Sequence, residues 1–315
     1  PPVLPSQTIQ AKADRPPGTT KKDLAYGTVG ILNVYDSEFP LPKGTKVKEL
    51  RVVNVFPKPN AFHATPMIGH SAQSLARGVL GTVPVEADGS VYFRCPTGAS
   101  IYFQLIDDKG LAIHTMRSGT YLHPGETMTC TGCHEPQTSA AKLDMKGKKL
   151  TALAFKRKPS ELKREATGSY PLSFPRLVQP VLDAKCAPCH AKKNKKKPLA
   201  GDRFSKHGWS EAFTTLRPYA WGKAGGNGAV KSPNKRCYSI PGKDCARVSK
   251  LYQMLAKGHN KVELTAEEMR RITLWIDCNS NFYGAYLNIE KQARGAIVAP
   301  KLGLPKWIDF DALKR

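Results

Sequence analysis

Two short stretches, CTGCH at residues 130–134 and CAPCH at residues 186–190, place two cysteines three positions apart with a histidine directly behind the second. This is the attachment motif of c-type haem, in which two thiols bond the porphyrin and the histidine binds the iron. The spacing keeps all three side chains on one turn, where they reach one porphyrin edge. We therefore predict two covalent haems, whose thioether cysteines and proximal histidines are Cys130, Cys133, His134, Cys186, Cys189 and His190.

Other uses of paired cysteines explain the motifs less well. Two C-x-x-C pairs are also what a four-thiolate zinc site uses, but zinc does not require a histidine behind each pair. A thioredoxin-like redox centre needs one C-x-x-C on a helix that follows a strand. Structural disulfides leave His134 and His190 unexplained. Zinc is therefore not expected.

Haem of this type is attached outside the cytoplasm, so we expect a periplasmic or otherwise extracytoplasmic protein. The sequence begins at Pro1 without methionine, which is consistent with removal of a signal peptide. Disulfides are then permissible. We expect a Cys237–Cys245 bridge across a Pro-Gly turn, with Cys245–Cys278 as the alternative, and Cys95 as a buried free thiol.

Hydrophobic periodicity predicts a β-rich first half. Residues 1–23 are proline-rich and are expected to form an extended arm. Residues 24–140 contain short runs that alternate with period two, separated by turn signals at 87–89 (Ala-Asp-Gly) and 108–110 (Asp-Lys-Gly). Several short strands of this kind favour an antiparallel β-sandwich, with the first haem motif in a loop just past its last strand.

The second half has helical periodicity. A basic linker at 141–168 is expected to lead into a helical domain at 169–290, followed by a tail at 291–315. Thr265 and Glu268 form a capping box that opens a helix with an apolar stripe of Met269, Ile272, Trp275 and Ile276. The predicted class is α+β, with a β-sandwich-like domain carrying the first c-haem and an α-helical cytochrome c-like domain carrying the second.

Charge predicts the kind of partner. The chain has 49 Lys and Arg against 25 Asp and Glu, a net charge of +24, concentrated at Lys142–Arg164 and Lys192–Lys197. Such a field attracts anionic surfaces, although a basic run can also be only a solvated face. No nucleic-acid signature is present and no apolar run reaches membrane-span length. We expect an acidic redox protein or other subunits of a complex as partners, no nucleic acid and no membrane span.

The order of several segments carries a resemblance to a known family. The segments are GTVPVEADGSVYF, TMRSGTYLHPGETMTCTGCHEP, FPRLVQPVLDAKCAPCH and KGHNKVELTAEEMRRITLWIDCNSNFYG. Together they resemble the haem-bearing parts of the hydrazine synthase alpha subunit and related multidomain cytochromes of planctomycete-type bacteria, over roughly residues 26–290. The resemblance implies a bis-histidine second haem, with His190 proximal and His259 distal.

The sequence departs from that family in two ways. No repeat of propeller-blade length is present, so the family's β-propeller is not expected here. The resemblance also implies a catalytic haem with a tyrosine on the iron and a zinc nearby. Here no tyrosine occurs in the EPQTSAAKLD stretch behind His134, and Tyr121 precedes the motif instead.

The axial ligands decide what each haem can do, because an iron with two strong ligands carries electrons and an open position binds substrate. For the second haem, His259 lies on a Gly-His turn between two predicted helices, with His207 and Met254 as further candidates. For the first haem we favour His70 or Met116 as the distal ligand, and an open position is the alternative. The other first-haem candidates are His63, His114 and His123.

Three function classes follow. The favoured one is a dihaem electron-transfer cytochrome within a larger complex. The second is a haem enzyme that acts on a small nitrogen compound or peroxide at the first haem. The third is a structural or interaction subunit.

Overall fold

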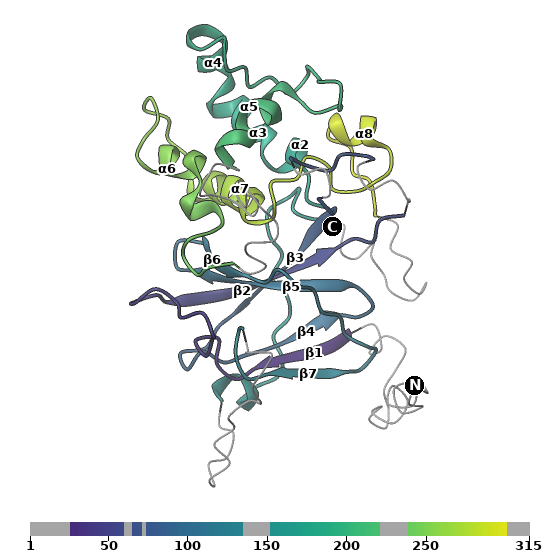
Figure 1. Cartoon of the computed structure of the whole chain (residues 1–315), viewed down its shortest axis with the longest axis vertical. Helices are drawn as coiled ribbons and strands as arrows, with labels where there is room; N and C mark the ends of the chain where they lie inside the picture. The colour runs from purple at the N-terminus through teal and green to yellow at the C-terminus, as the bar shows by residue number, and fades with distance from the viewer. Residues whose placement is uncertain (1–25, 60–64, 71–73, 135–151, 221–238, 301–315) are drawn as a thin grey trace.

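The computed structural model describes residues 26–59, 65–70, 74–134, 152–220 and 239–300, which form three stacked layers (Figure 1). Two β-sheets lie against each other, and the helices cover the outer face of the larger sheet. The predicted α+β class is confirmed. The strands are β1 (Tyr26–Ile31), β2 (Val47–Val55), β3 (Arg77–Pro84), β4 (Val91–Pro96), β5 (Ser100–Asp107), β6 (Ala112–Thr115) and β7 (Thr127–Cys130).

The strands form a sandwich. The smaller sheet has the order β4-β1-β7 and the larger one β3-β2-β5-β6. Neighbouring strands are antiparallel except β1 and β7, which run parallel. Alternate side chains of both sheets, such as Val29, Phe93, Leu50 and Leu105, are fully buried between them. Period-two alternation thus identified the strands, while the parallel β1–β7 pair is a departure from a purely antiparallel sandwich.

The helices follow the strands in the chain. They are α2 (Phe174–Leu177), α3 (Gln179–Lys185), α4 (Ala187–Lys193), α5 (Glu211–Ala220), α6 (Lys250–Ala256), α7 (Ala266–Asp277) and α8 (Ile289–Ala293), with short 3-10 turns η2 (Leu153–Lys156) and η4 (Ala246–Val248). Helix α7 begins at the predicted capping box, in which the Thr265 hydroxyl accepts the Glu268 N–H and the Glu268 carboxylate accepts the Thr265 N–H. Its predicted stripe is buried at Ile272, Trp275 and Ile276.

The sheet and the helices share one hydrophobic core. Val53, Val79 and Tyr102 of the larger sheet belong to the same buried cluster as Phe174 and Trp275 of the helices. The two predicted domains are therefore packed directly on each other. Among the described residues, no helix has both the length and the apolar character needed to cross a bilayer.

The described part of the predicted basic linker packs along the sandwich. Ala154 in η2 is buried, Ser160 bridges to Phe93 of β4, and Lys163 exchanges both backbone hydrogen bonds with Thr82 of β3. These bonds satisfy edge groups of both sheets. Residues 152–168 therefore belong to the sandwich, and the remainder of the predicted linker, like the arm at 1–23, lies outside the described residues.

The predicted disulfides have different outcomes. Cys95 is a buried free thiol, as expected, and burial raises its pKa well above the usual range. The alternative Cys245–Cys278 bridge is not formed. The Cys278 thiol instead points toward Gln104 Oε1 at 3.8 Å, and burial raises its pKa to about 12. Cys237 lies outside the described residues.

A buried ion pair joins β2 to α7. Arg51 Nη1 lies 3.3 Å from Asp277 Oδ2, and both side chains are fully buried. Asp277 also accepts the backbone N–H groups of Ala112 in β6 and Ala246 in η4, at 3.1 and 2.8 Å. Arg51 further donates to Glu165 at 3.2 Å. This network holds the helices on the larger sheet.

Asp277→Ala should destabilise the protein strongly, because it removes the buried carboxylate that pairs with Arg51 and leaves two backbone N–H groups buried without their acceptor. A loss of about 3–5 kcal/mol is expected in the free energy of unfolding, measured by chemical denaturation. Glu267→Ala is the matched control, since the Glu267 carboxylate is exposed and its ion pair with Arg271 should contribute below about 1 kcal/mol. Equal effects of the two substitutions would contradict the central role of Asp277.

Candidate functional site

The second C-x-x-C-H motif lies on a helix, as predicted. Cys186 caps the N-terminus of α4, which contains Cys189 and His190. The chain after α4 folds back so that His190 Nδ1 meets the carbonyl oxygen of Lys197 at 2.7 Å. Because a carbonyl only accepts, Nδ1 carries the proton and Nε2 keeps its lone pair. His190 therefore presents a metal-binding nitrogen.

His259 is the histidine that faces His190. The two ring centroids are 6.2 Å apart and the ring planes are inclined by 42°. His259 follows Gly258, whose φ of 85° turns the chain after α6. In this arrangement the Asn260 amide lies 3.2 Å from His259 Nε2, so metal binding through that nitrogen requires the amide to turn away.

The other candidates for the second site are engaged elsewhere. The ring of His207 packs against Trp209, with centroids 5.1 Å apart. Met254 on α6 packs against the shared hydrophobic core. The structure thus brings His190 and His259 together and places neither alternative between them.

The first C-x-x-C-H motif is held by the loop after β1. Cys130 ends β7, the Cys133 N–H donates to Asp36 O at 3.0 Å, and the Glu38 N–H donates to His134 O at 2.9 Å. A Cβ at Gly132 would collide with the Asp36 carbonyl oxygen, so the middle of this motif accepts only glycine. The motif therefore begins on the last residue of β7 instead of lying wholly past the last strand, and its remaining residues form the predicted loop, which is bonded to the smaller sheet.

His114 of β6 lies opposite His134. Their ring centroids are 5.9 Å apart with the planes inclined by 47°. Phe39 packs edge-on against His134 at 4.6 Å, and Glu38 Oε2 lies 3.6 Å from His134 Nδ1. His114 is one of the first-haem candidates in the sequence, although His70 and Met116 are the favoured ones. Its one distinguishing signal was its position inside an apolar strand, LAIHTM.

The two favoured first-haem candidates have other contacts. His70 Nδ1 lies 3.2 Å from Arg217 Nη1, and burial, with the Arg217 charge, lowers the pKa of His70. The Met116 sulfur accepts the Phe103 N–H at 3.4 Å. His123 packs against Tyr121 at a centroid distance of 5.2 Å. His63 lies outside the described residues. The structure favours His114 over His70 and Met116 as the partner of His134.

The surroundings of His114 keep it neutral and fix its proton. Burial, followed by the nearby His134, lowers the pKa of His114 to about 4. Its Nδ1 lies 3.0 Å from Ser239 Oγ, and the Ser239 hydroxyl donates to Thr115 O at 2.5 Å. His114 Nε2 is buried and meets no polar partner among the described residues.

The two motifs are far apart in the fold. Figure 1 shows β7, which carries Cys130, near one end of the long axis and α4 near the other. Within the described ranges, no three His, Cys, Asp or Glu side chains gather to hold one metal ion. A four-thiolate zinc site built from both motifs does not fit this separation.

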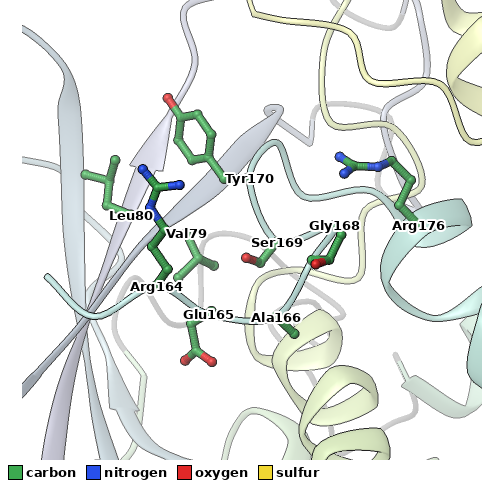
Figure 2. A pocket seen from close by; sticks show the side chains of 10 residues that line it. Val79, Leu80, Arg164, Glu165, Ala166, Gly168, Ser169, Tyr170 and Arg176 are labelled. Atoms are coloured by element: carbon green, nitrogen blue, oxygen red, sulfur yellow. The ribbon is translucent and has the colours of Figure 1, made fainter. Parts of the chain in front are cut away.

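A separate small cavity lies where the sandwich meets the helices. It has a volume of about 120 Å³ and is lined largely by the segment 164–170, with Val79 and Leu80 of β3 and Arg176 of α2. Figure 2 shows Arg164, Tyr170 and Arg176 around it. Neither a cysteine nor a histidine lines it, so it is distinct from both motifs.

Comparisons with known proteins agree with the resemblance predicted from the motifs. A family model of the hydrazine synthase alpha subunit middle domain matches residues 45–135. Hydrazine synthase subunit alpha of Kuenenia stuttgartiensis is 38% identical over 58 residues, which are 18% of this chain and 7% of that protein. A solved structure of Kuenenia stuttgartiensis hydrazine synthase has a TM-score of 0.53 at 20% identity, covering 82% of this chain and 43% of that one.

These matches cover only part of each related protein. The chain spans less than half the length of the solved hydrazine synthase chain and a small fraction of the curated subunit. At 20% identity the structural similarity shows the fold alone. The family match ends just past the first C-x-x-C-H motif, so it includes Cys130, Cys133 and His134.

Proposed function

We propose that this hydrazine synthase alpha-like chain is a dihaem c-type cytochrome that transfers electrons to or from an acidic redox partner. We place it outside the cytoplasm, as a subunit of a larger complex. The observation that carries the proposal is the pair His190 and His259, which face each other beside Cys186 and Cys189.

The residues of the second motif fit a haem. Metal–imidazole nitrogen bonds are about 2 Å long. Two imidazoles that share one metal therefore have centroids about 6 Å apart, and the 6.2 Å separation of His190 and His259 matches this. The Lys197 carbonyl supplies the outer hydrogen bond that orients a ligating histidine. An iron with two such ligands has no open position and exchanges electrons.

The charge around His190 supports partner docking. The side chains of Lys192, Lys193, Lys195, Lys196 and Lys197 are exposed. The backbone of this run is bonded to His190 through Lys197 O, so the charge lies beside the second motif. Lys197 also donates to the Tyr219 hydroxyl, and its ammonium lies over the Tyr219 ring at 5.0 Å. An acidic partner would be drawn to this end of the molecule.

A haem enzyme is the second candidate. The family match to the hydrazine synthase alpha subunit middle domain includes the first motif and favours chemistry there. Such chemistry on a small nitrogen compound or peroxide needs an open position on the first iron. The ligands of that iron therefore separate the two candidates.

The protein should contain two haems that remain bound after denaturation. Replacing Cys130 and Cys133 by Ala, or Cys186 and Cys189 by Ala, should each leave one, measured by mass spectrometry and by the pyridine haemochrome spectrum. Bound zinc without covalent haem would refute the proposal.

His259→Ala should make the second haem high-spin and able to bind carbon monoxide. Its reduction potential should rise, because a nitrogen ligand that stabilises ferric iron is lost. His207→Ala is the matched control and should leave the optical spectrum unchanged. A low-spin spectrum in the His259→Ala protein would transfer the role to His207 or Met254.

Electron exchange with an acidic partner should slow steeply as ionic strength rises. Electrostatic steering raises association rates roughly 10 to 1000 fold, and salt screens it. Replacing the five exposed lysines Lys192, Lys193, Lys195, Lys196 and Lys197 by Gln should slow exchange at low salt and flatten this dependence. Stopped-flow kinetics over a salt series measures both effects. If this variant exchanges electrons at the wild-type rate at every salt concentration, the lysine run is only a solvated face.

A further inference from the structure

We propose that His114 is the second axial ligand of the first haem iron and that Ser239 positions it. The first haem is then a six-coordinate electron carrier without an open position. The inference rests on the proposed function in one respect, since it takes haem to be bonded to Cys130 and Cys133.

The geometry repeats that of the second motif. His114 and His134 have ring centroids 5.9 Å apart, and His190 and His259 have centroids 6.2 Å apart. Both distances suit two imidazoles on one metal, for which about 6 Å is expected from bonds of about 2 Å. Of the described first-site candidates, His114 is the one in ring contact with His134.

The hydrogen bonds of His114 leave the correct nitrogen available. A hydroxyl has one proton, and that of Ser239 is donated to Thr115 O at 2.5 Å. Ser239 Oγ can therefore only accept from His114 Nδ1, at 3.0 Å, which places the ring proton on Nδ1. Nε2 keeps its lone pair. Histidines that bind metals generally donate their other ring N–H to such an outer group.

Among the residues that the structure describes, the lone pair of His114 Nε2 has no partner although it is buried. No described polar atom bonds it, and His114 is 2% exposed in β6. Buried polar atoms without partners are uncommon in folded proteins and need an explanation. The iron of a haem bonded through its porphyrin to Cys130 and Cys133, and bound by His134, would supply one, because it would be the partner of this nitrogen.

Ser239 belongs to the helical half of the chain, which gives the first site a dependence on both halves. The Gly242 N–H donates to Ile113 O at 2.7 Å, and Thr115 N–H donates to Ser239 Oγ at 3.3 Å. These bonds hold the segment after residue 238 along β6. Ser239 acts through His114, so it is a positioning residue.

The test uses the full-length holoprotein and begins with the wild type. Electron paramagnetic resonance should show two low-spin ferric haems, and the reduced protein should not bind carbon monoxide. His114→Ala should retain two covalent haems but make one of them high-spin and reactive with carbon monoxide. His114→Gly with added imidazole should restore the low-spin signal. His123→Ala, which removes an exposed histidine from the loop before Cys130, should behave as wild type.

Ser239→Ala should retain the low-spin signal while raising the potential of the first haem, because the His114 ring loses an outer acceptor that increases its basicity. Carbon monoxide should then displace His114 roughly 10–100 fold more readily. Ser239→Thr keeps the hydroxyl and should restore the wild-type potential.

The outcomes separate this inference from the proposed function. A wild-type protein with two covalent haems, one of them high-spin and open to carbon monoxide, would overturn the role of His114 and leave the dihaem proposal standing. A low-spin first haem in His114→Ala would do the same. Absence of covalent haem would contradict both the role of His114 and the dihaem proposal. If His114→Ala fails to fold, the wild-type spectra and carbon monoxide reaction decide.

Discussion

The fold depends on the buried pair of Arg51 and Asp277, because this pair fixes the helices on the larger sheet. Burial raises the pKa of Asp277, and the Arg51 charge opposes that effect. Breaking such a pair costs more than making it contributes, since the remaining charge stays buried. Asp277 also binds the N–H groups of Ala112 and Ala246. The Asp277 carboxylate thus holds β6, which contains His114, next to the segment that contains Ser239.

The two proposed haem sites are built from different parts of the chain. Cys186, Cys189 and His190 lie on or at the end of one helix, and the Lys197 carbonyl that orients His190 is close in sequence. The first site requires a loop after β1, the end of β7, the strand β6 and Ser239 from beyond α5. Disturbing the contact between sheet and helices should therefore affect the first site before the second.

This difference explains how much was predictable from sequence. The C-x-x-C-H motifs, the α7 capping box and the alternating strands depend on local sequence, so each could be predicted without knowledge of the tertiary structure. His259 was identified through a resemblance and a Gly-His turn, and it lies opposite His190. His114 was one of several histidines because its position beside His134 depends on how two sheets stack. A hydrophobic alternation gives the face of a strand but not the residue that the other sheet places across from it.

The placement of charge then distinguishes the two ends of the molecule. If both irons have two histidine ligands, neither binds a small substrate, and the chain conducts electrons only where a partner can approach. The exposed lysines of residues 192–197 lie beside the second motif, whereas Cys133 of the first motif is half-buried and packs against the core of the sandwich. Attraction of an anionic surface acts over about a Debye length, roughly 8–10 Å, so it favours contact at the second haem. The proposed second haem is therefore the expected site of exchange with an acidic partner, and the proposed first haem, whose ligand His114 is bonded to Ser239, is the one whose ligation depends on the fold.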